Sequence, residues 1–134
     1  MKTLQLRQVG PTAVEMAGGT GEDAWAIRVN VPGEGAKGSG PKPTELLALA
    51  LAACKAMTAL QYAQRKGHEL QGLAIDVDYE MAENPRRIAR ITTRFSGMKT
   101  QLDAETLERV TAAMKACTIS RTLEAGINLE TFVE

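Results

Sequence analysis

Two cysteines are the residues of this chain whose type and placement suit them best to chemistry. Cys54 lies inside the longest apolar stretch, residues 43–60, and Cys117 closes a second amphipathic stretch further along the chain. A thiolate can attack the terminal oxygen of a hydroperoxide and become a sulfenic acid, which a second thiol converts to a disulfide that an external thiol reduces. Two thiols on the apolar faces of two helices can also be small core residues, which is the more common case on spacing alone. The spacing therefore leaves a redox pair and a pair of core residues both open.

The other side chains argue against several further classes of site. A structural zinc site takes four ligands in close pairs, whereas this chain has two cysteines 63 residues apart and a single histidine, His68. A Ser or Cys hydrolase needs a histidine beside its nucleophile, and His68 follows a predicted helix end, where we expect it to be solvated. Acidic and basic residues balance at 16 each and no basic run exceeds two. Binding to nucleic acid or to an anionic membrane is therefore not expected.

The first third of the chain is predicted to form short strands. Residues 3–9 alternate loosely, residues 12–16 form a possible second strand, and residues 25–31 alternate strictly between apolar and polar side chains. The glycine-rich residues 32–41 follow and lack the spacing of a phosphate-binding loop, so we expect a flexible connection there.

A long helix is predicted to begin at Pro43 or Thr44 and to end before Gly67, a length of about 23 residues. Thr44 can cap its free amides, and Glu45 complements the positive end of its dipole. Residues 46–60 are apolar on nearly every face, which predicts burial on all sides, although 15 residues with a lysine among them are too few for a membrane span. Because one small domain covers such a helix poorly, we expect a homodimer in which two copies pack these helices together.

The second half of the chain predicts a hairpin followed by another helix. Alternating apolar residues mark strands at 73–81 and 88–95, and the Asn-Pro pair between them is a turn signal. Asp103 is placed to cap a helix whose apolar residues are three, four and three apart and end with Cys117.

The last predicted elements complete an α+β pattern. A short helical turn is expected at residues 119–124 and a closing strand at residues 127–133. The order is then β-β-β-α-β-β-α-α-β, in one domain over residues 1–134. The first residues lack the apolar stretch and cleavage site of a secretory signal, so the expected location is the cytoplasm. In that reducing compartment paired thiols are more often catalytic or redox-sensing than a permanent disulfide.

The segments around the two cysteines resemble the signatures of a known family. The first motif comprises Gly40-Pro41-Lys42-Pro43-Thr44-Glu45-Leu46-Leu47, then Leu51-Ala52-Ala53-Cys54, then Tyr62-Ala63-Gln64-Arg65-Lys66-Gly67. The second motif is Lys115-Ala116-Cys117-Thr118-Ile119-Ser120-Arg121-Thr122-Leu123. Both are similar to the motifs of the OsmC/Ohr family, and the resemblance covers nearly the whole chain from Gly40 onwards.

The resemblance implies an OsmC-like fold, which is an intertwined α+β homodimer with two long central helices and active sites at the subunit interface. Characterised members are thiol-dependent peroxidases that reduce organic hydroperoxides in oxidative or osmotic stress defence. By this resemblance Cys54 is the peroxidatic cysteine and Cys117 the resolving one. The reductant is an external thiol or dithiol, and no metal or organic cofactor is implied.

Three positions depart from the pattern of the characterised peroxidases. Their glutamate ten residues before the first cysteine is Thr44 here, and Glu45 follows one step later, about 100° further around the helix. Their proline after the second cysteine is Thr118. Their activating arginine lies in the poorly matched N-terminal region, where Arg28 and Arg7 are the candidates. The chain therefore resembles the less characterised OsmC-like branch. Two alternatives to a peroxidase stay open: a non-enzymatic small-ligand-binding protein and a cysteine redox sensor.

Overall fold

The computed structural model describes residues 4–30 and 40–134, which fold as two compact units. The first unit ends at Leu47 and the second runs from Ala48 to Glu134, so the boundary between them falls inside a long helix. Three strands are followed by that helix, a two-stranded hairpin and two further helices. The predicted α+β class is confirmed.

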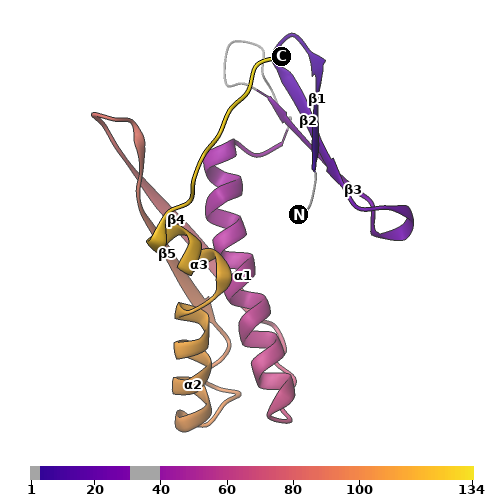
Figure 1. Cartoon of the computed structure of the whole chain (residues 1–134). Coiled ribbons are helices and arrows are strands. Elements are labelled where there is room, and N and C mark those ends of the chain that lie inside the picture. The colour runs from indigo at the N-terminus through magenta and orange to yellow at the C-terminus, as the bar shows by residue number, and fades with distance from the viewer. Residues whose placement is uncertain (1–3, 31–39) are drawn as a thin grey trace. The chain divides into compact units, whose positions relative to one another are not determined.

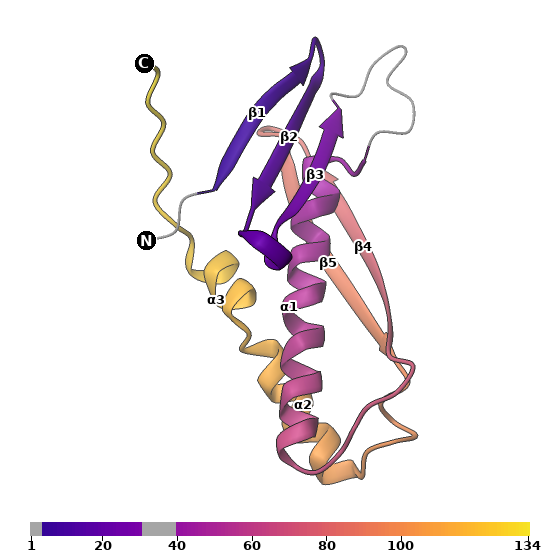
Figure 2. The same ribbon diagram turned by 90° about the vertical axis from the view of Figure 1, so that its right-hand side faces the viewer.

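The first unit contains an antiparallel sheet of three strands in chain order (Figure 2). Its strands are β1 (Gln5–Gly10), β2 (Ala13–Gly18) and β3 (Trp25–Asn30), with a 3₁₀ turn, η1 (Gly21–Asp23), before the last of them. All three predicted strands are confirmed. The loop expected at residues 32–41 falls almost wholly outside the described residues.

Gly40, the first residue of the motif before the long helix, has a structural requirement for glycine. Its φ is +83°, and a Cβ atom there would lie 1.8 Å from the backbone carbonyl oxygen of Arg28. A side chain is therefore excluded both by the backbone conformation and by the close approach to β3.

The long helix α1 (Pro43–Arg65) has the 23 residues that the sequence predicts. Pro43 occupies the first helical position, where a missing amide costs no hydrogen bond. At the other end Gly67 has a φ of +82° and donates its N–H to the Gln64 carbonyl at 3.0 Å, which closes the helix as predicted.

The prediction that α1 is buried on all sides is wrong for the single chain. From Ala48 onwards its buried residues are Ala48, Leu51, Ala52, Ala59 and Ala63. Over the same part of the helix, from Ala48 onwards, three large apolar residues remain exposed: Leu49 (52%), Met57 (58%) and Leu60 (42%). The elements of one chain cover only one side of the helix, so an apolar side is left without cover.

The core of the second unit lies where α1 meets α2 (Ala104–Lys115) and the hairpin of β4 (Ala74–Ala82) and β5 (Arg87–Ser96) (Figure 1). Its buried residues are Ala59, Ala63, Met98, Leu102, Val110 and Met114, with Tyr62, Leu70, Leu73, Phe95 and Leu107 packed against them. The small alanines of α1 pack in this cluster with the larger side chains of α2. The hairpin is antiparallel, as predicted.

Two shorter helices follow the hairpin. Asp103 caps α2, since its Oδ1 accepts the N–H of Thr106 at 2.8 Å. This confirms the predicted cap. A third helix, α3 (Thr118–Ala125), confirms the helical turn expected at residues 119–124 and ends at Gly126.

The closing strand predicted at residues 127–133 is wrong: residues 126–134 form neither helix nor strand. Their apolar side chains are exposed, up to 96% for Val133. An alternating segment becomes a strand only when it pairs with the open edge of a sheet. Within the described residues, residues 127–133 pair with neither of the two sheets. The observed order is therefore β-β-β-α-β-β-α-α. The structure is that of one chain, so the expected intertwined homodimer stays a prediction.

Candidate functional site

Cys54 lies in the middle of α1 and is half-buried. Its backbone carbonyl accepts the Thr58 hydroxyl at 2.8 Å, one turn further along the helix. The position of Cys54 is therefore set by regular helix geometry, with its sulfur on a rigid element.

Cys117 lies at the junction of α2 and α3 and is only 5% exposed. Its backbone is extended, with φ −64° and ψ 157°, so it serves as the N-cap residue of α3. Its N–H donates to the Met114 carbonyl at 3.3 Å, and its carbonyl accepts the N–H of Arg121 at 3.0 Å. A single non-helical residue, held from both sides, thus fixes this sulfur at the start of a helix.

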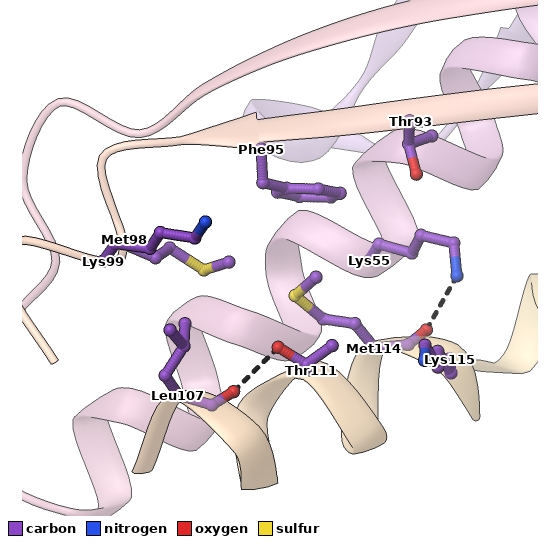
Figure 3. Close-up of a pocket in the computed structure, with 9 residues that line it drawn as sticks. All are labelled: Lys55, Thr93, Phe95, Met98, Lys99, Leu107, Thr111, Met114 and Lys115. Atoms are coloured by element: carbon purple, nitrogen blue, oxygen red, sulfur yellow. Dashed lines mark hydrogen bonds between the residues drawn. The ribbon is translucent and has the colours of Figure 1, made fainter. Parts of the chain in front are cut away.

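A lysine connects the two cysteine-bearing segments. Lys55, next to Cys54, donates from Nζ to the backbone carbonyl of Met114 at 3.0 Å, three residues before Cys117 (Figure 3). The Cys54 side chain in turn acts on the Cys117 sulfur and lowers the pKa of Cys117. Both cysteines are reduced in the structure. Two thiols that are 63 residues apart in the sequence therefore meet in one place.

The surroundings of Cys117 favour its ionised form. The Ser120 hydroxyl lies 3.2 Å from the Cys117 sulfur, and both side chains are buried. Burial raises the pKa of Cys117, but the Ser120 hydroxyl and amide, the Cys54 thiol and the charge of Lys55 together lower it below its ordinary value of 9.0. The Ser120 amide makes no full capping hydrogen bond to the sulfur, yet its dipole still favours the thiolate.

This arrangement has the parts that thiol redox chemistry needs. A thiolate is the reactive form of cysteine, and a neighbouring cation or the start of a helix promotes it. A second thiol within reach can then take part in disulfide exchange. Within the described residues no group of three or more His, Cys, Asp or Glu side chains is placed to hold a metal.

A pocket of about 300 Å³ borders this region, between α1, α2 and β5 (Figure 3). Its lining combines apolar side chains with three lysines and two threonines: Phe95, Met98, Leu107, Met114, Lys55, Lys99, Lys115, Thr93 and Thr111. The described lining includes neither cysteine, but it includes Lys55 and Met114, whose hydrogen bond joins the two cysteine-bearing segments. An apolar molecule with a polar or anionic end fits such a lining.

The sequence profile of the OsmC-like protein family matches residues 35–132, which include both cysteines. The chain belongs to the OsmC-like protein family. The resemblance stated from the two cysteine motifs is thereby confirmed.

Solved structures of similar fold cover nearly the whole of this OsmC-like chain. A candidate osmotic stress induced and detoxification response protein from Psychrobacter arcticus is 23% identical, with a TM-score of 0.74, and the match covers 91% of this chain and 88% of that one. A candidate redox protein from Lactobacillus casei is 15% identical, with a TM-score of 0.59 and coverage of 92% and 84%. An OsmC-like hydroperoxide resistance protein from Jannaschia is 17% identical, with a TM-score of 0.55 and coverage of 98% and 90%. At these identities the likeness establishes the OsmC-like fold. No curated protein matches the chain.

The other candidate residues of the OsmC-like site lie in the first compact unit. Glu45 is in the first turn of α1 and is half-buried. Arg28 on β3 and Arg7 on β1 are exposed, and the sheet register places both of them opposite Glu15 of β2. Cross-strand pairing with a carboxylate is a structural reason for two arginines at these positions. Whether Glu45 or Arg28 acts on a cysteine stays a prediction.

Sequence reasoning missed two residues of this OsmC-like site. Lys55 was noted only as a charge within an apolar run, and its contact with Met114 depends on tertiary packing that no local pattern reveals. Ser120 carries a local signal: a hydroxyl three residues after Cys117, at the start of a helix, has the spacing of a capping interaction. That spacing could have identified it.

The helix that carries Cys54 also has the length and apolarity of a membrane span. Core helices of soluble proteins pass the same test. The OsmC-like fold gives α1 a core role, because its alanines pack into the hydrophobic cluster with α2.

Proposed function

We propose that this OsmC-like protein is a thiol-dependent peroxidase that reduces organic hydroperoxides through Cys54 and Cys117. The observation that carries the proposal is the meeting of two reduced thiols, with the pKa of Cys117 lowered by Ser120, Cys54 and Lys55. Two core residues would gain nothing from an environment that favours a charged sulfur. A relative of the same fold is named a hydroperoxide resistance protein, which supports the same class of reaction.

In the first step Cys54 is the attacking sulfur, because it is half-buried while Cys117 is buried. The proton of Cys54 passes to the Cys117 sulfur, with which the Cys54 side chain interacts. The Cys54 thiolate then attacks the terminal oxygen of the hydroperoxide, so that an S–O bond forms and the O–O bond breaks. Cys54 becomes a sulfenic acid, and the leaving alkoxide takes the proton from Cys117 and departs as an alcohol.

In the second step the Cys117 thiolate attacks the sulfur of the Cys54 sulfenic acid. The S–S bond forms, the S–O bond breaks, and hydroxide leaves and takes a proton from solvent to become water. An external dithiol then reduces the disulfide by exchange and restores both thiols, with the electrons supplied by the dithiol.

Peroxide consumption by purified variants tests this proposal. With cumene hydroperoxide and excess dithiothreitol the parent protein is expected to turn over many times. Cys54→Ser is expected to abolish turnover. Cys117→Ser is expected to form one sulfenic acid per chain without closing a disulfide. Consumption by Cys54→Ser at the rate of the parent would contradict the proposal.

A non-enzymatic binding protein is the second candidate, and the pocket beside Lys55 favours it. Its apolar lining and three lysines suit a small amphipathic anion without any reaction at sulfur. Thiol titration with graded cumene hydroperoxide separates the candidates. Inert thiols support the binding protein. One round of oxidation without turnover supports a redox sensor, and loss of two thiols per chain that dithiothreitol reverses with turnover supports the peroxidase.

We further propose that the protein is a homodimer. The exposed apolar residues of α1 and the exposed alternating residues after Gly126 support it, since both are apolar surfaces that one chain leaves uncovered. Met57→Lys places a charge on the exposed side of α1 and is expected to raise the monomer fraction in light scattering at fixed concentration. Gln61→Lys, at an exposed polar position on the same helix, is the matched control. A monomeric parent protein would refute the dimer.

The proposed location is the cytoplasm, because a peroxidase regenerated by external thiols needs a reducing compartment. Cell fractionation tests this, and recovery of the protein outside the cytoplasmic fraction would argue against it.

A further inference from the structure

We propose that Ser120 is a positioning residue that donates a hydrogen bond to the Cys117 thiolate when it forms and so speeds closure of the disulfide with Cys54. This role rests on the peroxidase function proposed above.

Ser120 is placed for this role by both its burial and its contact. It is the one buried polar side chain in the described segments 4–30 and 40–134, at 7% exposure. A buried hydroxyl needs a hydrogen-bond partner, since water cannot reach it freely. The Cys117 sulfur lies 3.2 Å from its Oγ. The contact therefore joins two buried side chains in the first turn of α3 and is not a chance approach of two surface groups.

The direction of this hydrogen bond depends on the ionisation of Cys117. A thiolate has no proton, so the Ser120 hydroxyl must donate to it, and hydrogen bonds to charged groups are stronger than those between neutral groups. The titratable groups that act on the Cys117 sulfur are Cys54 and Lys55, both from α1. Among the contributions that lower the pKa of Cys117, that of the Ser120 side chain is the largest.

The step that Ser120 assists is the attack on the sulfenic acid. The Cys117 thiolate supplies an electron pair to the Cys54 sulfur, and the electron pair of the S–O bond leaves with hydroxide. Loss of the Ser120 hydroxyl raises the pKa of Cys117, so fewer chains carry the attacking thiolate at neutral pH. The first step also involves Cys117, because its sulfur accepts the proton of Cys54, so closure is timed from the sulfenic acid form onwards.

A single-turnover experiment with Ser120→Ala tests the inference. The reduced protein is mixed with one equivalent of cumene hydroperoxide, quenched with acid at set times, and resolved by mass spectrometry into sulfenic acid and disulfide forms. The rate of closure is measured across a pH series. For each unit by which the pKa of Cys117 rises, closure is expected to be about threefold slower at low pH, because the thiolate is rarer there. Closure is expected to be about threefold faster at high pH, where every Cys117 is ionised and the more basic thiolate is more nucleophilic. A variant that is merely loosened closes more slowly at every pH.

Two further comparisons keep the test independent of folding. Thr122→Ala removes a hydroxyl that bonds the Thr118 carbonyl on the same helix, and it is expected to keep the pH profile of the parent. Ser120→Thr and Ser120→Val introduce side chains of the same shape, of which only threonine has a hydroxyl. The threonine variant is therefore expected to resemble the parent and the valine variant to resemble Ser120→Ala.

The outcomes separate this inference from the proposed function. Cys54 of the parent left unoxidised by peroxide would overturn both. Oxidation and closure in the parent, with an unchanged pH profile in Ser120→Ala and Ser120→Val, would overturn the role of Ser120 and leave the peroxidase standing.

Discussion

Lys55→Met removes the polar contact between the two cysteine-bearing segments while it keeps an unbranched apolar side chain of similar length. In the parent the Lys55 Nζ donates to the Met114 carbonyl at 3.0 Å. That carbonyl lies in the last turn of α2, where the negative end of the helix dipole also attracts a cation. The change therefore removes one charged hydrogen bond and one favourable helix-end charge, and it spares the packing of the pocket.

The expected loss of stability follows from the burial of this contact. A hydrogen bond to a charged group contributes about 1.5–3 kcal/mol. Lys55 is only part-buried, and water can replace it at the Met114 carbonyl, so the lower part of that range applies. We expect the free energy of unfolding to fall by about 1.5–2 kcal/mol, or the Tm by about 5–8 °C for a chain of this size.

The same change is expected to raise the pKa of Cys117, but by less than Ser120→Ala does. The charge of Lys55 makes the smallest of the contributions that lower this pKa, whereas Ser120 makes the largest. Thiolate absorbance across a pH series measures both variants. A larger shift for Lys55→Met than for Ser120→Ala would contradict this ranking.

Urea unfolding followed by far-UV circular dichroism measures the stability of the parent and of Lys55→Met. Lys99→Met is the matched control, because Lys99 borders the same pocket and is exposed. It is expected to change stability little. Equal stability of Lys55→Met, Lys99→Met and the parent would refute the claim that Lys55 holds the two segments together.

Three further predictions concern the fold and its dependence on pH. Val110→Ala, at a fully buried position, should lower the free energy of unfolding by about 2 kcal/mol in urea, whereas Leu129→Ala, at a position 84% exposed, should leave it nearly unchanged. Because folding lowers the pKa of Cys117, the free energy of unfolding of the parent should increase as pH rises from the folded pKa toward 9.0. Urea unfolding at several pH values should show this increase in the parent and not in Cys117→Ser. Hydrogen bonds from Thr106 lower the pKa of Asp103 below 3.8, so Asp103 should contribute stability above that pH and lose it as acid titrates the folded carboxylate; Asp103→Ala should show a lower Tm at neutral pH and a weaker dependence in acid.

The parts of the fold that the sequence predicted well depend on local signals. The bounds of α1 follow from Pro43 at its start and Gly67 at its end, and the start of α2 follows from the Asp103 cap. These residues act within one turn of the helix that they begin or end. The strands were predictable for the same reason, since alternation is a property of the strand itself.

The parts that the sequence predicted wrongly depend on surfaces beyond the element concerned. The apolar character of α1 was correct, but burial requires something to cover Met57 and Leu60. The alternation at residues 127–133 was also present, but a strand forms only where a sheet edge accepts it. In both cases the sequence pattern shows that these residues favour burial or strand pairing, but the described part of the single chain offers no surface that covers or pairs with them.

The candidate site divides in the same way. The cysteines were identifiable from their flanking motifs, but their meeting and the lowered pKa of Cys117 come from packing between α1 and the end of α2. Lys55 therefore needed the structure, whereas the three-residue spacing of Cys117 and Ser120 was visible in the sequence.

Cys117 occupies the N-cap position of α3, so a single residue both begins a helix and carries the proposed chemistry. The free energy by which the helix favours a thiolate is, by linkage, also the free energy by which a thiolate favours the helix. A disulfide carries no charge, so oxidation withdraws this support from residues 118–125. Amide hydrogen exchange in α3 should consequently be faster in the oxidised protein than in the reduced one, which would make the backbone of this helix a direct indicator of the oxidation state of the sulfur.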